Sequence, residues 1–343
     1  MHIEIVNPIT YPEWDELLLK NPDYSFFHSS AWASVLCKSY RYNPCYFIIR
    51  KDNSIASLIP FMEVNSLLTG KRGVSLPFTD FCKPLLIEKD NLDKIVEWII
   101  EYGKKRGWKY FEIRDGYNLL NNENPFSFYY EHYLALNEDE HQIYSQLKSN
   151  VKRNVKRAIK EGITIEFHNT LEAIREFYRL NCITRKYHNL PPQPYNFFNT
   201  IFDEIISKEK GIVLLANYKN KKIAGAVYFH FGDKVIYKYG ASDRKYQSLR
   251  ANNLVMWEAI KWYSIKGYRC FSFGRTSPEN KGLLQFKSGW GGDINKIYYF
   301  KYNIENQHFI NNTNTFNPGN NIFAYLPISL LKIIGRLLYR HIG

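Results

Sequence analysis

The sequence predicts an α/β protein built from two tandem domains, each with a mixed central sheet. The first observation is an internal repeat: residues 56–61 (ASLIPF) recur as 224–229 (AGAVYF), and residues 107–113 (GWKYFEI) recur as 267–273 (GYRCFSF). The two offsets, 168 and 160 residues, nearly agree. The second observation is the length of 343 residues, which exceeds what one hydrophobic core usually serves. Similarity at this scale is typical of a duplicated domain. The alternative is chance similarity, because unrelated α/β units share the same order of strands, turns and helices.

The elements of the second half follow from local patterns. Gly232 and Asp233 predict a turn between two apolar strands, and Gly267 predicts the end of a helix. Asn252 or Asn253 is expected to cap that helix. In order, we expect strands at 213–216, 223–231 and 234–239, a polar loop at 240–251, a helix at 252–265 and a strand at 268–273.

A strongly basic helix is expected within residues 141–161. Val151, Val155, Ala158 and Ile159 recur at helical spacing, and Gly162 marks the end. The other faces carry five cations, namely Lys152, Arg153, Lys156, Arg157 and Lys160. Crowded cations repel one another without a counter-charge, which favours a ridge that contacts phosphates. An ordinary solvated helix face is the alternative.

Residues 273–292 are the leading candidate for a site. They follow a predicted strand and combine Arg275, Lys281 and Lys287 with five glycines. Polar loops at strand ends are frequent sites in α/β proteins. Cations on a flexible backbone suit an anionic or developing oxyanion group. This stretch therefore favours a transferase over a scaffold.

The charge balance indicates an anionic partner. The net charge is +13 and the isoelectric point is about 9.3. RNA, a phosphorylated carrier and an anionic membrane face all fit this balance. A diffusely basic surface with no such partner is the alternative.

The cysteine pattern and the hydropathy of the chain indicate in which cellular compartment the protein is expected. The five cysteines are scattered without metal-ligand spacing, which indicates free thiols in a reducing compartment and no metal site. The first residues lack the pattern of a signal peptide, and no run approaches the roughly 20 apolar residues of a spanning helix. We therefore expect a cytoplasmic protein.

Several motifs resemble those of the Fem-type aminoacyltransferases (the FemABX group) and of their relatives encoded with exopolysaccharide and PEP-CTERM systems. They are L-K-S-N-V-K-R-N-V-K-R-A-I-K-E-G-I, Y-K-Y-G-A-S-D, F-x-F-G-R-T and Q-F-K-S-G-W-G-G, with F-H-S-S-A-W and L-P-F-T-D in the first half. The resemblance spans roughly residues 20–300. It implies two GNAT-like domains (the acyl-CoA N-acyltransferase fold). It also implies a reaction that joins an aminoacyl group from charged tRNA to an amine of a cell-wall precursor. The long helical hairpin that some members insert in the second domain is missing, which weakens the transfer of their tRNA-binding mode.

Such a reaction needs alignment of the amine, its deprotonation and stabilisation of a tetrahedral oxyanion. We expect Lys287 to contact the oxyanion or a phosphate, and the resemblance points to the same lysine. Asp243, in a loop after a strand, is the expected proton acceptor, with an ordinary turn residue as the alternative. Arg275 is expected to bind a phosphate or carboxylate, or else to pair with Glu279 or Asp243. The other expected substrate-binding residues are Lys281, Ser242, Gln285, Trp290, Arg250, Asn252, Trp32, Phe78 and Asp80, and the expected nucleic-acid contacts are Lys152, Arg153, Lys156 and Arg157.

The loop before the second-half helix bears on the donor. Coenzyme-A-dependent acetyltransferases carry a glycine-containing Q/R-x-x-G-x-G/A turn there, whose bare backbone grips the pyrophosphate. The corresponding residues 244–251 (RKYQSLRA) contain no glycine. Side chains would crowd that approach. The loop favours aminoacyl-tRNA over acyl-CoA, and no further cofactor is expected.

The boundaries that we expect are a first domain over 1–135, a second domain with the main site over 136–303, a linker over 304–322 and a C-terminal helix over 323–343. In that helix Leu330, Leu331, Ile334, Leu337 and Leu338 share a face, while Lys332, Arg336 and Arg340 point elsewhere. It either rests on the inner face of a membrane or packs on the protein's own core.

Three functions remain open from the sequence. The first is metal-independent aminoacyl or acyl transfer to an amine of a peptidoglycan- or exopolysaccharide-related precursor. The second is acyl-CoA-dependent N-acylation of a nucleotide-linked amino sugar. The third is a non-catalytic RNA- or envelope-binding protein, for which Lys287→Ala and Arg275→Ala would leave the biological phenotype intact.

Overall fold

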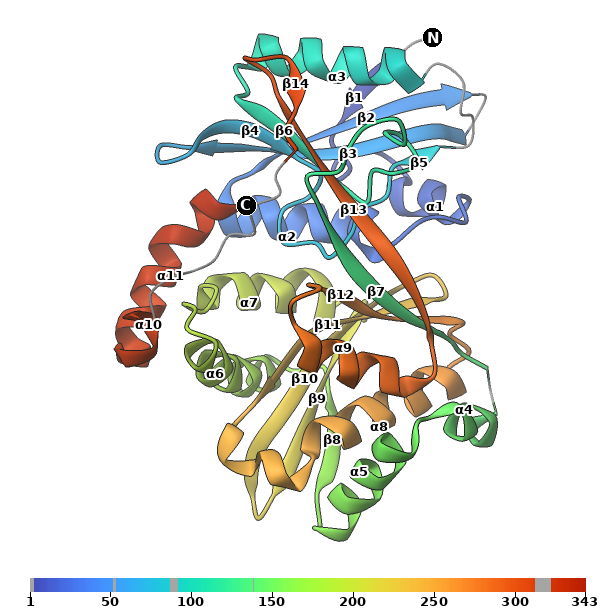
Figure 1. Ribbon diagram of the computed structural model, residues 1–343, viewed down its shortest axis with the longest axis vertical. Coiled ribbons are helices and arrows are strands. Elements are labelled where there is room, and N and C mark those ends of the chain that lie inside the picture. Colours follow the sequence, from blue (N-terminus) through green and yellow to red (C-terminus); the bar gives the residue numbers. More distant parts are fainter. Residues whose placement is uncertain (1–2, 52–53, 87–91, 138, 312–321) are drawn as a thin grey trace. The chain divides into compact units, whose positions relative to one another are not determined.

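The computed structural model describes residues 3–51, 54–86, 92–137, 139–311 and 322–343, and the chain divides into two compact units (Figure 1). The first unit comprises the described residues within Met1–Tyr130, Lys296–Asn317 and Leu338–Gly343. The second unit comprises those within Glu131–Asn295 and Pro318–Leu337. The chain therefore returns to the first unit after the second, whereas the sequence predicts two domains in succession.

The first unit is a mixed sheet with helices on both faces. The strand order is β1 (Ile3–Val6), β2 (Asn43–Lys51), β3 (Ser54–Ser66), β4 (Gly70–Val74), β6 (Tyr110–Arg114) and β13 (Asp293–Asn303). Strands β4 and β6 are parallel, and the other neighbours are antiparallel. The short strands β5 (Leu85–Leu86) and β14 (His308–Phe309) pair with β3 and β13. Helix α3 (Leu92–Arg106) covers one face, and α1 (Trp14–Leu19), η1 (Phe26–His28) and α2 (Ser30–Tyr40) lie on the other (Figure 1).

The core of the first unit is aromatic. Phe47 and Phe61 meet edge to face with their centroids 5.7 Å apart, and Phe61 contacts Phe111 in the same way. Ile95 and Ile99, one turn apart on α3, are buried against them because helical spacing puts both on one face.

The second unit repeats this plan. Its strand order is β8 (Thr164–His168), β9 (Gly211–Tyr218), β10 (Lys221–Phe231), β11 (Lys234–Ser242), β12 (Cys270–Thr276) and β7 (Ser127–Ala135), of which β7 belongs to this unit from Glu131 onward. Strands β8 to β11 are antiparallel, and β11 and β12 are parallel. The helices are α4 (Glu140–Gln146), α5 (Ser149–Lys160), α6 (Leu171–Tyr187), α7 (Tyr195–Ile201), η2 (Phe202–Ile206), η3 (Arg244–Leu249), α8 (Ala251–Ile265), α9 (Lys281–Lys287), η4 (Ser288–Trp290), α10 (Ile322–Tyr325) and α11 (Ile328–Ile342), of which α11 belongs to this unit up to Leu337.

The core of the second unit forms around α8. Trp257, Ile260 and Tyr263 of this helix are buried against the sheet, and Val151 and Val155 of α5 pack into the same cluster. Val151, Val155 and Ala158 of the basic helix therefore face inward, and its cations are left for the outer faces. Ile159, predicted on the same apolar face, is instead 56% exposed.

The two units share one topology, so the predicted duplication is confirmed. In each unit a hairpin leads into the central strand, β3 or β10. The next strand is antiparallel to it, and a helix, α3 or α8, then leads into a parallel strand. The parallel pairs β4–β6 and β11–β12 are each recorded over three residue pairs. The sequence repeats fall on β3 and β10 and on β6 and β12.

Three local expectations differ from the structure. Helix α8 begins after Arg250, which adopts a left-handed conformation, so neither Asn252 nor Asn253 is its cap. Part of the expected linker over 304–322 forms β14, and residues 312–321 of it lie outside the described residues. The stretch after Phe273 is not an open loop, because it continues β12 and then forms α9 and η4.

Candidate active site

The parallel strands β11 and β12 diverge toward their carboxyl ends. Their recorded pairing joins Lys234–Ile236 to Cys270–Ser272, and the strands then continue to Ser242 and Thr276. Gly274 lies in this continuation with φ +68°, a left-handed conformation that glycine adopts at little cost. Carboxyl ends of diverging parallel strands are where α/β folds commonly bind ligands.

Lys287 caps the end of β12. Its side chain is 3% exposed, and Nζ donates hydrogen bonds to the carbonyl oxygens of Gly274 at 2.9 Å and Arg275 at 3.0 Å. Helix α9 places the lysine in its last turn, where a cation also interacts favourably with the helix dipole. A buried ammonium group is therefore held at the end of this strand.

A cavity of about 150 Å³ opens beside the end of β11. The predicted residues Ser242, Asp243, Arg250 and Asn252 line it together. The other lining residues are Ile223, Ala224, Tyr246, Gln247, Ala251, Asn253 and Phe286. The volume is below the roughly 300–1,000 Å³ of typical small-molecule sites.

Hydrogen bonds hold the polar wall of this cavity. The Asp243 carboxylate accepts from the Lys245 amide at 3.1 Å and so caps η3, and Asn252 Nδ2 donates to Ser242 Oγ at 3.2 Å. The Ser242 amide donates to Thr184 Oγ1 at 2.9 Å, and the Thr184 hydroxyl donates to the Ser242 carbonyl at 3.1 Å. Ser242, Asp243 and Asn252 therefore each have a fixed hydrogen-bond partner.

The glycine-free turn takes the backbone shape that glycine usually supplies. Arg250 has φ +63° immediately before α8, although a left-handed conformation disfavours residues with a Cβ. Its side chain and those of Tyr246 and Gln247 line the cavity. These side chains thus fill the space through which a pyrophosphate would approach the backbone amides of a glycine-containing turn.

The remaining predicted residues near β12 are distributed differently. Lys281 and Gln285 are exposed on α9, while their neighbour Phe286 reaches the cavity wall. Trp290 is fully buried between Phe273 and Phe286, with centroids 6.4 and 5.9 Å away. Arg275 is partly buried, and its carbonyl is bound by Lys287. The structure therefore brings one group of predicted residues to the cavity and places a second group on β12, α9 and η4.

Gly289, Gly291 and Gly292 of the motif serve close packing rather than flexibility. A Cβ at Gly292 would lie 2.1 Å from the Tyr133 carbonyl oxygen, and one at Gly289 would lie 2.5 Å from Val151 Cγ2. Gly291 has φ +82° and would meet the backbone of Gln146. These contacts hold η4 against β7, α4 and α5.

His132 is a buried histidine that the sequence analysis did not select. It is 1% exposed, and neither ring nitrogen has a hydrogen-bond partner among the described residues. Burial lowers the pKa of its imidazole to about 4, with further effects from the ammonium groups of Lys287 and Lys148. One strand position before it, the Glu131 carboxylate accepts from Ser272 Oγ at 2.6 Å. A lone histidine in an apolar strand carries no sequence signal for this environment.

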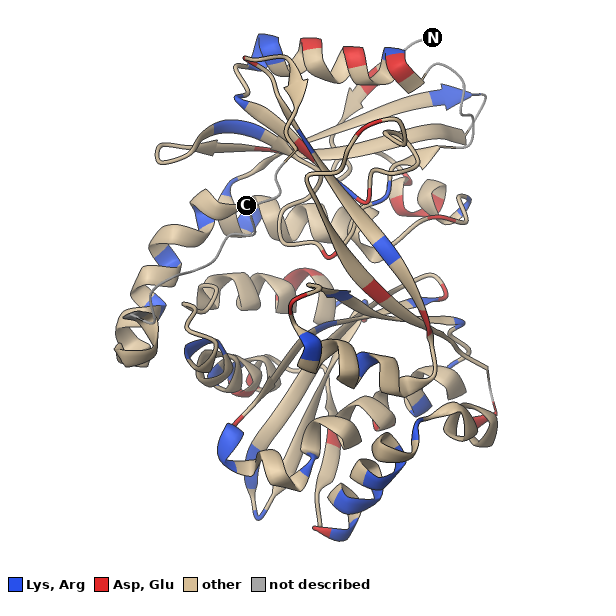
Figure 2. Ribbon diagram, in the orientation of Figure 1, with Lys and Arg blue, Asp and Glu red and all other residues tan. Residues whose placement is uncertain are grey.

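The basic helix α5 presents its cations outward, and blue segments run along it in Figure 2. Arg153 and Lys156 are exposed, and Arg157 lies 3.6 Å from Glu161. Lys152 instead donates to the Ser145 carbonyl at 2.8 Å and lies over the Tyr144 ring. Three of the four predicted nucleic-acid contacts are therefore exposed on one helix.

The predicted first-unit residues have packing roles. Trp32 is fully buried against Phe26 and Phe27. The Phe78 ring packs against that of Tyr40, tilted by 43° with the centroids 5.0 Å apart, and the Asp80 carbonyl accepts from Tyr299 Oη at 2.7 Å. These positions belong to the core and loops of the first unit.

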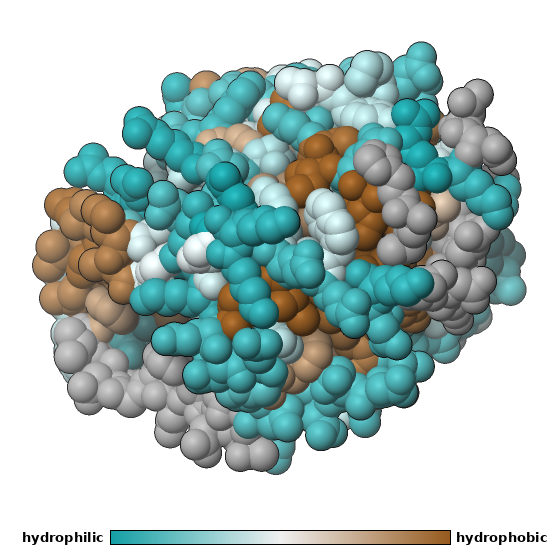
Figure 3. All heavy atoms as spheres, turned by 90° about the horizontal axis from the view of Figure 1, so that it is seen from above, coloured by the Kyte–Doolittle hydropathy of each residue, from teal (hydrophilic) through white to brown (hydrophobic). Residues whose placement is uncertain are grey.

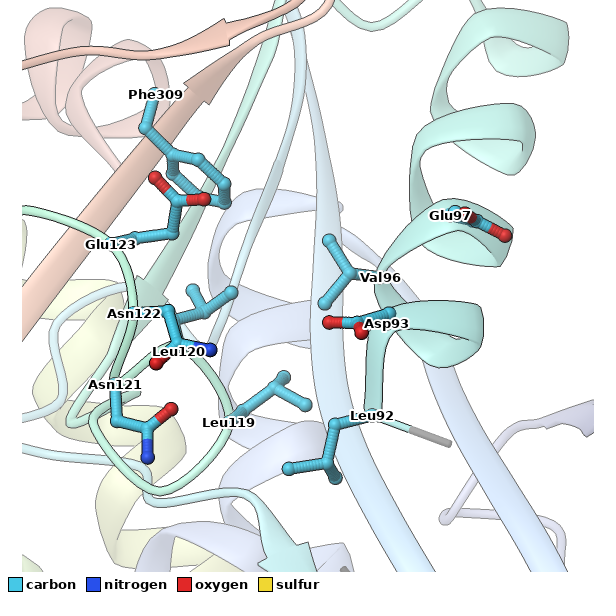
Figure 4. A pocket seen from close by; sticks show the side chains of 10 residues that line it. All are labelled: Leu92, Asp93, Val96, Glu97, Leu119, Leu120, Asn121, Asn122, Glu123 and Phe309. Carbon is cyan, nitrogen blue, oxygen red and sulfur yellow. The ribbon is translucent and has the colours of Figure 1, made fainter. Parts of the chain in front are cut away.

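The first unit holds a second cavity, of about 410 Å³, between α3 and residues 119–123 (Figure 4). Asp93 on α3 faces Leu120 across it, and Glu123 lies beside Phe309. No predicted site residue lines this cavity. Its carboxylates make it unsuitable for a phosphate group.

Other expectations concern metals, thiols and membranes. The cysteines at 37, 45, 82, 182 and 270 are free. In the described ranges, no group of three or more His, Cys, Asp or Glu side chains could hold a metal ion. Nor does any described helix have the length and apolar character needed to cross a bilayer.

Comparison with known proteins identifies the fold. Residues 145–288 match the family model of the acetyltransferase (GNAT) domain. A crystal structure of FemX superposes with a TM-score of 0.67 at 13% identity, covering 87% of this chain and 96% of that one. A tandem GNAT protein from the clavulanic acid biosynthesis pathway gives 0.58 at 8% identity over 88% and 99%. The C-terminal domain of a putative lysylphosphatidylglycerol synthetase from Agrobacterium fabrum gives 0.53 at 13% identity over 83% and 91%. No curated protein matches the sequence.

These similarities confirm a fold of two tandem GNAT-like domains. The match of residues 145–288 to the acetyltransferase (GNAT) domain supports an acyltransferase.

Proposed function

We propose that this chain transfers an aminoacyl group from charged tRNA to an amine of a cell-envelope precursor, in the peptidoglycan or exopolysaccharide class. The resemblance to Fem-type enzymes and the GNAT-like fold support transfer to an amine. The observation that carries the choice of donor is the 150 Å³ cavity, because side chains of a glycine-free turn form its wall. Such a cavity suits a small aminoacyl group better than coenzyme A.

The reaction requires one new bond and one broken bond. The acceptor nitrogen attacks the ester carbonyl carbon, and a tetrahedral oxyanion forms. The bond from that carbon to the ribose oxygen then breaks as the amide forms. The proton lost by the amine passes to Asp243 and from there to the departing ribose oxygen.

The cavity residues supply the positions for this chemistry. Asp243 keeps further lone pairs beside the one that accepts from the Lys245 amide. Ser242 and Asn252 offer a hydroxyl and an amide for the aminoacyl group. We assign Lys287 to oxyanion or phosphate stabilisation through its charge at the end of β12, with Arg275, Lys281 and Gln285 as further substrate-binding residues. Trp290, which the sequence predicts as a further substrate contact, is fully buried between Phe273 and Phe286 and has a packing role instead.

The exposed cations of α5 are proposed to bind the tRNA backbone. Arg153, Lys156 and Arg157 lie on one helix, and Lys152 at its start contributes the fourth charge. Each phosphate contact makes binding weaken with added salt. The reaction is proposed to occur in the cytoplasm, next to acceptors at the inner membrane face.

A second candidate is acyl-CoA-dependent N-acylation of a nucleotide-linked amino sugar. The match to the acetyltransferase (GNAT) domain favours this donor. It predicts saturable binding of acetyl-CoA at the start of α8, where backbone amides would have to reach the pyrophosphate past Arg250.

The test compares donors on the purified chain. Binding of acetyl-CoA, mixed charged tRNA and uncharged tRNA is measured at the same moderate salt, and transfer is followed with a radiolabelled aminoacyl group and an amine acceptor. We expect a preference for charged tRNA and loss of transfer in Asp243→Asn, with unchanged folding. Asp203→Asn, an exposed acid on η2, is the matched control and should keep full transfer. Saturable acetyl-CoA binding without tRNA preference would replace the first proposal by the second.

A further inference from the structure

Helix α11 leaves part of its apolar surface uncovered. Within the second unit, Leu331 is fully buried, and a Cβ at Gly335 would lie 2.0 Å from the Pro192 carbonyl oxygen. The helix therefore packs closely through one side. Leu330, Ile333 and Leu337 are instead 40, 48 and 60% exposed.

These three residues form a continuous strip. Their spacing of three and four residues places them on one face of the helix. Figure 3 shows exposed hydrophobic side chains gathered in patches within an otherwise hydrophilic surface. The sequence expectation that Leu330, Leu331, Ile334, Leu337 and Leu338 act as one face is thus divided, because Leu331 faces the protein and Leu330 and Leu337 face solvent.

Beside the strip lies a cavity of about 510 Å³ with cationic walls. It is lined by Arg175, Tyr178, Arg179, Pro194, Tyr195, Asn196, Lys332, Ile333 and Arg336. Four of these nine residues are cations. Glu172 and Glu176 pair with Arg175 and Arg179, so these two arginines of the cavity wall are locally neutralised.

The cations of α11 keep their charge available. Lys332 lies over the Tyr178 ring at 5.3 Å, and Arg336 has no ion pair within the described part of the chain. Arg175 also donates to Tyr195 Oη at 3.3 Å, which fixes the opposite wall. The cavity therefore combines a fixed aromatic wall with an excess of positive charge.

Ile333 joins the two features, since it lines the cavity and is half exposed on the strip. A soluble phosphate would satisfy the cations but leave the aliphatic strip in water. A phospholipid satisfies both, because its phosphate and its acyl chains are covalently joined. We propose that α11 and this cavity bind the surface of an anionic phospholipid bilayer, with one lipid phosphate in the cavity and the strip in the interface.

This inference goes beyond the transfer reaction and does not depend on its donor. Membrane attachment would bring the catalytic domain to a lipid-linked acceptor. Each basic residue near an anionic surface contributes about 1 kcal/mol, so two cations and a short apolar strip give reversible binding.

The experiment uses the full chain and vesicles of phosphatidylcholine with or without 30% phosphatidylglycerol as the probe (about one lipid in three, to give a clearly negative surface). Sedimentation with the vesicles should show binding that requires phosphatidylglycerol. Leu330→Ser/Ile333→Ser and Lys332→Gln/Arg336→Gln should each weaken it by tenfold or more. The matched control is Ile265→Ser/Lys266→Gln at the end of α8, because Ile265 is also exposed and Lys266, like Lys332, lies over an aromatic ring. This control should bind like the unmodified chain.

A second measurement guards against misfolded variants. Ile333→Trp keeps an apolar side chain, and brominated phosphatidylglycerol should quench its added fluorescence. Equal binding to both vesicle types, no binding at all, or unchanged binding in the α11 variants would overturn the proposal. So would glycerol phosphate binding without vesicles at the same affinity, or loss of tRNA binding rather than vesicle binding in the variants. Transfer to a soluble amine should persist in every α11 variant, so failure here and failure of the transfer reaction are distinguishable.

Discussion

The Lys287 ammonium group donates a hydrogen bond to the Gly274 carbonyl oxygen at 2.9 Å and thereby ties the last turn of α9 to the end of β12. A second bond, to the Arg275 carbonyl at 3.0 Å, adds to the first. The lysine that the sequence selects for catalysis is thus also a structural cap. The structural role follows from its charge at the end of a diverging strand, and the catalytic role is a proposal that uses the same charge.

Lys287→Met should lower the free energy of unfolding by about 2–4 kcal/mol, because it leaves two carbonyl groups in a buried environment without a charged donor. Lys281→Met on the exposed first turn of α9 should change stability by less than about 0.5 kcal/mol. Denaturant unfolding of both variants checks this. A Lys287→Met protein as stable as the unmodified chain would show that the cap contributes little.

Part of this arrangement could be predicted from the sequence. Apolar patterns and turn residues locate the strands and helices because these signals are local, and the repeat reveals the tandem fold. The carbonyl partners of Lys287 lie 12 and 13 residues upstream, and the sequence contains no signal that pairs them. The burial of His132 and the return of β13 to the first unit depend on strand pairing between distant segments, which periodicity does not report.

Gly292→Ala should destabilise the protein by about 2–4 kcal/mol, since its Cβ would lie 2.1 Å from the Tyr133 carbonyl oxygen and the backbone would have to move. Gly282→Ala is the matched control, because open space surrounds that position in α9 and alanine favours a helix by about 1 kcal/mol. Thermal unfolding should therefore move in opposite directions for the two variants. Equal shifts would show that the second unit tolerates movement of η4.

Acid should destabilise the protein through His132. Its pKa in the folded chain is about 4, below the ordinary value of 6.5, so the unfolded state binds more protons between these values. The contribution of His132 to the free energy of unfolding is therefore fully present above pH 6.5. It is lost as the pH falls toward 4, which lowers the free energy of unfolding by up to about 3 kcal/mol. Burial also lowers the pKa of His188 and His230, and those groups add to the same trend.

His132→Leu should reduce the fall in unfolding free energy between pH 7 and pH 4.5 while keeping the neutral-pH stability within about 1.5 kcal/mol. His141→Leu, at an exposed position of α4, should retain the slope of the unmodified chain. Denaturant titrations at several pH values give the slopes. If the two variants show the same slope, His132 is not the group responsible.

The backbone of Arg250 allows the cavity to be opened without disturbing the fold. Arg250 has φ +63°, so Arg250→Gly should stabilise the chain by about 0.5–1 kcal/mol as the left-handed conformation loses its cost. Arg41, with φ +60° at the end of α2, offers the same backbone change at a first-unit position, and Arg41→Gly should stabilise to a similar extent. Transfer from charged tRNA should fall at least threefold in Arg250→Gly and stay unchanged in Arg41→Gly, because only the former removes a cavity wall. A rise in acetyl-CoA-dependent acylation with no loss of tRNA-dependent transfer would mean that Arg250 excludes coenzyme A rather than binding the aminoacyl donor.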